Sequence, residues 1–199
     1  MADNFDNNIL LKLKLLLLTL VIIFVMAYIS WQPYKGAGNN PPNLSENGFS
    51  LKKAESHLDY IANLQRSPGT LGHQKSQTYI IDQLRAIGLQ AEVQQSTVQS
   101  PRLNWMGLVA KVNNVVARIK GSGNGDAILF VSHYDSVDTG NGANDNAVGV
   151  AALLELSRAY SRQARKLNDV IFLFTDVEEA GLLGAEAFAE KHPFAKDVK

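Results

Sequence analysis

The chain has 199 residues, of which 46% are hydrophobic and 19% are charged, so it can bury the core of one globular domain with appendages. Its 19 basic and 19 acidic side chains balance, which leaves no net positive field for nucleic acid, and we expect no nucleic-acid partner. The chain contains no cysteine, so disulfides, thiolate zinc sites and cysteine nucleophiles are excluded. Any bound metal must use His, Asp and Glu.

An apolar segment lies near the N-terminus. Leu15 to Ile29 contains no charged side chain, and apolar residues extend this segment back to Ile9. A bilayer needs about twenty residues of helix to cross it, so we predict a short tail at 1–8 and a transmembrane anchor at 9–31. The lipid bilayer is therefore an expected partner of Leu15 to Ile29. A buried helix of a soluble protein and a signal peptide cleaved after Ala27 are the alternatives.

The charges around the anchor predict its orientation. Lys12 and Lys14 precede the apolar core and only Lys35 follows it closely, which favours a cytoplasmic N-terminus. We therefore expect a membrane location with a single-pass anchor and the globular part on the extracytoplasmic or lumenal side. Residues 32–48 are rich in Gly, Pro and Asn and predict a linker, and the folded domain is expected at 49–199.

Helical and strand patterns alternate along the rest of the chain. Ser50 predicts the start of one helix, and a loop at 66–72 separates it from a second helix that starts at Ser76 or Gln77 and ends at Gly88. A third helical pattern covers 147–160, and strand patterns cover 91–95, 115–119, 127–133 and 169–175.

The last two strand patterns are nearly unbroken apolar runs, which are typical of strands covered on both faces. Their alternation with helical patterns predicts an α/β fold with a mostly parallel, mixed sheet flanked by helices on both faces.

Polar residues with metal-ligand chemistry follow these two apolar strands. His133 and Asp135 end the first strand, Asp145 precedes the helix near 147, and Glu178 and Glu179 follow the second strand. In open α/β sheets reactive groups collect at the carboxyl ends of strands, so these residues should converge on one edge. Each also has a structural explanation. Asp145 suits a helix N-cap, His133 a satisfied buried imidazole, and the Glu pair a solvated surface.

Taken together, the segments VSHYDS, GANDNAVGVAALLE and FTDVEEAGLLGA resemble the metal-binding signatures of M28 zinc peptidases. The resemblance extends roughly from Leu51 to the end of the chain. It implies a zinc-exopeptidase-like fold and metal-dependent, aminopeptidase-like hydrolysis of peptide substrates with two zinc ions.

The resemblance implies a role for each matching residue. His133 would bind one zinc ion, Asp145 would bridge both ions, and Glu179 would bind the second. Glu178 would be the general base that takes a proton from the metal-bound water. Asp135 would complete the catalytic set by orienting the site, as carboxylates beside metal-bound histidines commonly do.

The same resemblance implies ligands that this chain does not show, namely an acidic residue some distance after Glu179 and a later histidine. His192 lies in a segment that resembles a non-ligand stretch, and His57 and His73 are expected to be surface or packing residues. Asn146 stands where the family often has Asp, which leaves the neighbouring ligand in place. We therefore expect an incomplete, N-terminal part of the peptidase domain that is inactive alone and binds zinc weakly.

Two alternatives remain open from the sequence. A non-catalytic, receptor-like or binding module on the same fold is one, because fold does not determine function. The presence of every metal ligand that falls within this span favours the enzyme. A carboxypeptidase or an aminoacyl cyclase on the same scaffold is the other.

Overall fold

The structure is a computed structural model that describes residues 2–31, 48–99, 107, 109–123, 126–164 and 166–198. The chain divides into two units, Met1–Asn43 and Leu44–Lys199, which are described separately. The predicted linker, apart from residue 48, lies outside the described residues.

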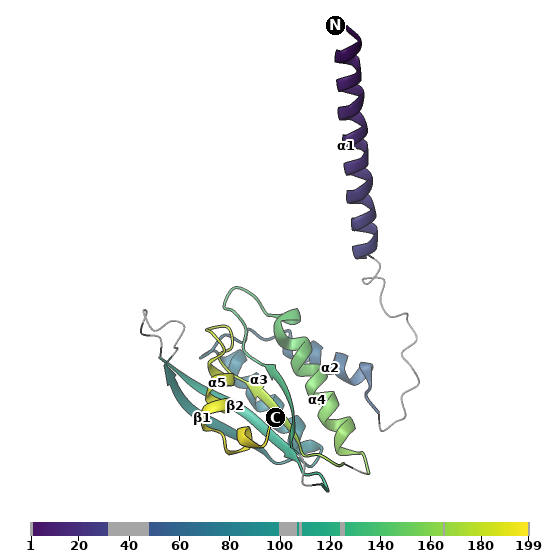
Figure 1. Cartoon of the computed structure of the whole chain (residues 1–199). Coiled ribbons are helices and arrows are strands. Elements are labelled where there is room, and N and C mark those ends of the chain that lie inside the picture. The colour runs from purple at the N-terminus through teal and green to yellow at the C-terminus, as the bar shows by residue number, and fades with distance from the viewer. Residues whose placement is uncertain are drawn as a thin grey trace. The chain divides into compact units, whose positions relative to one another are not determined.

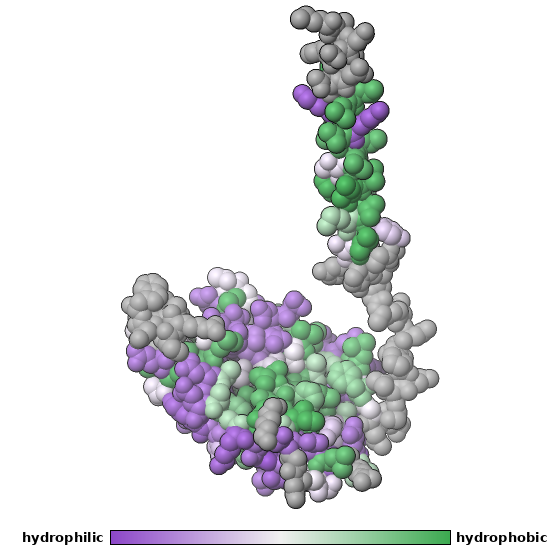
Figure 2. Space-filling view, viewed as in Figure 1, coloured by the Kyte–Doolittle hydropathy of each residue, from purple (hydrophilic) through white to green (hydrophobic). Residues whose placement is uncertain are grey.

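The described residues of the first unit form the helix α1 (Ala2–Trp31), shown in Figure 1. Its segment Ile9–Trp31 has 23 residues, is apolar enough to cross a membrane, and has none of its most apolar window buried. Figure 2 shows apolar side chains along this helix. The hydroxyl of Thr19 donates to the carbonyl of Leu15 at 2.9 Å, so this polar group is satisfied within the helix itself.

The second unit is built on a four-stranded sheet with the strand order β1-β2-β4-β3. β1 (Ala91–Gln99) pairs antiparallel with β2 (Val109–Ile119), which pairs antiparallel with β4 (Val170–Thr175). β3 (Ile128–His133) pairs parallel with β4. The mixed α/β fold is confirmed, but the described pairings are mostly antiparallel rather than mostly parallel. The connection from residue 99 to residue 109 is too short for the crossover helix that parallel neighbours need.

Helices cover both faces of this sheet, as predicted (Figure 1). Three helices lie on one face, namely α2 (Leu51–Ile61), α3 (Leu71–Ala86) and α4 (Val148–Ser161). β2 and β4 supply alternate residues to the apolar core beneath them: Val115, Ala117, Ile119, Val170, Phe172 and Phe174. The opposite residues of these strands pack against α5 (Leu183–Lys191) and the short helix η4 (Pro193–Asp197).

The two strands that lead to the predicted site differ in burial. Every residue of β4 is buried, as predicted for a central strand. β3 is the edge strand of the described sheet, and Ile128 and Val131 are 45% and 50% exposed. The prediction that β3 is covered on both faces is therefore wrong for the described residues, because Ile128 and Val131 lie on opposite faces of the strand and both are exposed.

The helix boundaries follow their caps. α2 begins after Ser50, whose hydroxyl accepts from the amide of Lys53, as predicted. α3 begins at Leu71 rather than at Ser76 or Gln77, because the Thr70 hydroxyl caps it by accepting from His73 N at 3.2 Å. Gly88, with a φ of 83°, follows the end of α3, which agrees with the prediction.

Candidate metal centre

Three chain segments bring the predicted ligands together. β3 and β4 are parallel neighbours, so their carboxyl ends lie at the same edge of the sheet, where His133 is paired with Thr175. Asp145 lies in the irregular turn η3 (Ala143–Ala147) that leads into α4. Glu179 lies in the turn after β4. The predicted convergence of these segments is therefore present in the fold.

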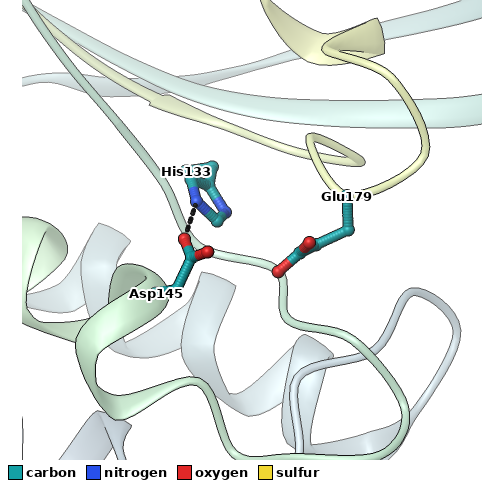
Figure 3. Close-up of side chains that lie close together, drawn as sticks. All are labelled: His133, Asp145 and Glu179. Atoms are coloured by element: carbon teal, nitrogen blue, oxygen red, sulfur yellow. Dashed lines mark hydrogen bonds and ion pairs between the residues drawn. The ribbon is translucent and has the colours of Figure 1, made fainter. Parts of the chain in front are cut away.

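The three side chains face one another (Figure 3). One potential ligand atom from each of His133, Asp145 and Glu179 lies within 4.8 Å of the other two. His133 Nε2 is 2.9 Å from Asp145 Oδ1. His133 is buried, whereas both carboxylates are exposed. One imidazole nitrogen and two carboxylates are a donor set that zinc accepts, so these residues fit a metal site that is open to solvent on one side.

Asp145 does not cap the helix that follows it. Its side chain is 76% exposed and bonds to His133. The N-cap position of α4 is Ala147, and Asn146 Oδ1 accepts from Gly149 N at 3.0 Å. Asn146 therefore satisfies a free amide of the first helical turn, and Asp145 is left facing the histidine.

Asp135 holds the turn that carries the glutamate pair. This fully buried carboxylate accepts from Glu178 N at 3.0 Å through Oδ1 and from Glu179 N at 3.1 Å through Oδ2. Asp135 Oδ1 also lies 3.5 Å from His133 Nδ1, and Glu178 Oε2 lies 3.8 Å from His133 Nε2. One buried carboxylate thus connects the predicted histidine ligand with both glutamates.

The backbone before the glutamate pair has an uncommon conformation. Val177 has a φ of 55°, in the left-handed region, where a β-branched residue is strained by about 1–3 kcal/mol. The turn is stabilised by the amides of Gly181 and Leu182, which both donate to Glu178 O at 2.8 Å, and by Leu183 N, which donates to Val177 O. Strain of this kind is concentrated at functional sites. The sequence carries no signal for it, because valine ordinarily avoids this region.

The carboxylates dominate the electrostatics of the site. Burial alone would lower the pKa of His133, but hydrogen bonding and charge from Asp135, Asp145 and Glu178 outweigh burial and raise that pKa to about 9. Burial and the nearby Asp145 carboxylate raise the pKa of Glu179. A bound cation would relieve this concentration of negative charge.

His73 contributes to the site in a way that the sequence did not indicate. His73 Nε2 lies 2.7 Å from Asp176 Oδ1, both residues are buried, and the imidazole stacks on Tyr134 with ring centroids 5.0 Å apart. Asp176 Oδ2 also accepts from Asn113 N at 2.9 Å. The pair therefore fixes the segment just before Glu178. The expectation of an ordinary packing residue missed this hydrogen-bonded pair, because its partner is 103 residues away along the chain.

The other two histidines contact residues outside the cluster. His57 Nδ1 lies 2.8 Å from the Tyr79 hydroxyl, and His192 Nε2 lies 3.0 Å from Glu92 Oε1. The structure therefore gives both histidines partners of their own.

Comparison with known sequences identifies the family. Residues 114–199, which include every predicted site residue, match the family model of peptidase family M28. This part of the chain is similar to peptidase family M28. The resemblance seen in the three sequence segments is therefore confirmed.

Two similar curated proteins are much longer than this chain. A vacuolar membrane protease of Laccaria bicolor is 32% identical over 184 residues, which cover 88% of this chain and 17% of that protein. A vacuolar membrane protease of Candida albicans is 31% identical over 190 residues, which cover 94% of this chain and 22% of that protein. The chain thus spans less than a quarter of the length of either relative.

Solved structures confirm the zinc-exopeptidase-like fold. A glutaminyl cyclase of Porphyromonas gingivalis superposes with a TM-score of 0.63 at 23% identity, over 74% of this chain and 55% of that one. A zinc aminopeptidase of Bacillus subtilis superposes with a TM-score of 0.64 at 14% identity, over 78% of this chain and 69% of that one.

Proposed function

We propose that this chain supplies the first part of the active site of a membrane-anchored, metal-dependent peptidase of the aminopeptidase type. The observation that carries the proposal is the cluster of His133, Asp145 and Glu179 at the carboxyl edge of the sheet, within the segment that matches family M28. The names of the longer relatives, which are membrane proteases, support the same activity and location.

His133, Asp145 and Glu179 would hold the metal. We propose two zinc ions, with His133 on one, Glu179 on the other and Asp145 as the bridge. Bound zinc lowers the pKa of a water molecule and polarises a peptide carbonyl. The remaining ligands, a further acidic residue and a second histidine that the family resemblance implies, would lie outside these 199 residues.

Glu178 is the proposed general base. Its side chain is 31% exposed and reaches the same edge of the sheet as the ligands. Its carboxylate would accept a proton from the attacking water and deliver that proton to the leaving amine. Asp135 would keep Glu178 in place, because it accepts the amide hydrogen of this residue. The two glutamates would therefore have separate tasks.

Ile9–Trp31 is the proposed membrane anchor, with the folded unit on the extracytoplasmic or lumenal side. Retention of the protein in membranes after alkaline extraction, with an N-terminal tag still attached, would support an uncleaved anchor. Loss of the tag would indicate a signal peptide instead.

An assay of the whole protein tests the proposed reaction. We expect hydrolysis of fluorogenic aminoacyl substrates to be lost on metal chelation and restored by added zinc. N-acetylated versions of the same substrates should not be hydrolysed, because an aminopeptidase acts at a free N-terminus. Hydrolysis that survives complete chelation would contradict the proposal.

An aminoacyl cyclase is the second candidate, favoured by the likeness to the glutaminyl cyclase of Porphyromonas gingivalis. Release of ammonia from a peptide with N-terminal glutamine, without release of a new amine from the rest of the peptide, would identify this activity.

A further inference from the structure

Arg66 is a fully buried cation that lies behind the loops of the metal centre. Its side chain bonds to main-chain carbonyl oxygens at five points, which belong to three separate chain segments. Nε donates to Tyr134 O at 2.9 Å, Nη1 to Ile61 O at 3.0 Å, to Leu64 O at 3.4 Å and to Asn141 O at 2.5 Å, and Nη2 to Gly142 O at 2.9 Å.

This way of burying a charge has a stability cost. Removing an ion from water costs several kcal/mol unless the interior provides compensating interactions. Burial accordingly lowers the pKa of Arg66, while the carboxylates of Asp135 and Glu179 act in the opposite direction. The planar guanidinium has five donors in a fixed arrangement, whereas a lysine ammonium has three. The geometry around Arg66 therefore calls for an arginine rather than for any cation.

One of the three segments contains Tyr134 and lies next to the histidine of the metal centre, His133. Tyr134, which accepts from Arg66 Nε, lies between His133 and Asp135. The next residue but one, Ser136, is held by the Arg66 main chain. Ser136 Oγ accepts from Arg66 N at 3.1 Å, and Ser136 N donates to Arg66 O at 3.3 Å. Arg66 thus fixes the chain on both sides of Asp135.

Another of the three segments, residues 141–142, leads to Asp145, the proposed bridging carboxylate. Asn141 and Gly142 lead directly into the turn that contains Asp145. Gly142 O accepts from Arg66 Nη2 and also from Ala147 N at 3.0 Å, so one carbonyl joins the arginine to the far end of this turn.

Gly142 packs closely against the guanidinium of Arg66. It has a φ of 56°, and a Cβ atom at this position would lie 3.1 Å from Arg66 Nη2 and 2.1 Å from Asp145 O. The absence of a side chain allows the loop to approach the guanidinium closely. The loop and the arginine therefore form one packed unit.

We propose that Arg66 is a positioning residue that sets the separation of His133 and Asp145 before metal binds. The inference rests on the proposed function, since it gives the two residues a metal to hold. The rigid guanidinium of Arg66 holds the carbonyls of Tyr134 and Gly142. Arg66 thereby keeps the exposed Asp145 carboxylate facing the buried His133 imidazole. Metal affinity then depends on a residue that does not touch the metal.

Hydrogen–deuterium exchange of the metal-free full chain in detergent micelles tests the positioning step. Arg66→Lys should accelerate exchange of the amides at 141–147 at least tenfold, because an ammonium cannot span all the carbonyls. Arg158→Lys is the matched control, because Arg158 is also buried but bonds to Glu155 and Gly48. Unchanged exchange at 141–147 in a folded Arg66→Lys chain would overturn the proposal.

Cobalt titration of the same proteins tests the consequence for the metal. Arg66→Lys should bind Co²⁺ at least tenfold more weakly than the wild type and with an altered visible spectrum, while Arg158→Lys should match the wild type. If Arg66→Lys does not fold, Ser136→Ala provides the test, with an expected loss of threefold or more. Wild-type affinity in a folded Arg66 or Ser136 variant would overturn the proposal. A wild-type chain that binds no Co²⁺ would instead contradict the proposed function, and the exchange data would still decide the role of Arg66.

Discussion

Asp135 lies outside the ligand cluster but accepts hydrogen bonds from the amides of both glutamates. Asp135→Asn would replace one of its two accepting oxygens by an amide group, which cannot accept from the Glu178 or Glu179 N–H. Removal of such a supporting partner typically weakens metal binding by about 10–100-fold. Equilibrium dialysis with zinc should show this loss, whereas Asp138→Asn, at an exposed neighbouring position, should bind as the wild type does. Equal affinities for all three proteins would show that Asp135 does not support the site.

Glu178 and Glu179 are adjacent, and their proposed roles separate them. In the whole protein, Glu178→Gln should reduce hydrolysis of aminoacyl substrates by about 10²–10⁴-fold, because the amide cannot accept the proton of the water. Its zinc content should stay near that of the wild type, since Glu178 is not a proposed ligand. Glu190→Gln, on the exposed side of α5, is the control. Turnover retained in Glu178→Gln would place the base elsewhere.

Sequence reasoning identified the residues at strand ends and missed those that support them. The convergence of His133, Asp145 and Glu179 was predictable, because His133 ends β3, Asp145 lies just before α4 and Glu179 follows β4, so chain order places them at one edge. Arg66 and His73 act through partners that are distant in the chain, and a pattern of neighbouring residues cannot show such partners.

At the scale of elements, the His73–Asp176 pair connects α3 to the end of β4. His73→Ala would leave Asp176 buried without its imidazole partner, and the lost hydrogen bond to a charged group corresponds to about 1.5–3 kcal/mol of unfolding free energy. Urea unfolding of the chain should show this decrease. His57→Ala removes a half-buried imidazole bonded to Tyr79 and should lower the free energy of unfolding by less. A larger loss in His57→Ala than in His73→Ala would contradict this assignment.

Two predictions about elements were wrong, namely where α3 begins and how far β3 is buried. α3 begins at Leu71 because Thr70 caps it inside a segment whose Pro and Gly residues indicated only a loop. β3 has the apolar composition of a central strand but is the edge strand of the described sheet. The apolar run of β4 was correctly predicted to be buried, because its neighbours on both sides are within the described sheet.

At the scale of the whole molecule, Asp169 joins parts of the second unit at the end of the sheet away from the metal centre. It accepts from Arg118 Nε at 2.7 Å and from Gly121 N at 2.7 Å, and Arg118 also pairs with Asp197 of η4. Burial would raise the pKa of Asp169, but the Gly121 amide and the Arg118 and Lys120 cations outweigh burial and lower it. Asp169 therefore favours the folded state wherever it is ionised.

This shift predicts how stability depends on pH. An unfolded aspartate has a pKa of about 3.9, so the folded state with its lower pKa binds fewer protons. The contribution of Asp169 is fully present above about pH 5 and is lost as the pH falls below about 4. Asp169→Asn should therefore be less stable than the wild type at pH 7, and the difference should shrink towards pH 3. Urea unfolding across this range measures the effect, and a difference that does not change with pH would contradict it.

Metal binding to the chain tests the central claim most directly, because the claim is that His133, Asp145 and Glu179 form part of a metal centre. Calorimetric titration with Zn²⁺ should show weak binding by the wild-type chain, loss of binding in His133→Ala, and wild-type binding in the control His57→Ala. Metal analysis after dialysis should show no tight retention of two zinc ions by these 199 residues, because the cluster among the described residues supplies three ligands for two ions. Wild-type zinc affinity in His133→Ala would contradict the account.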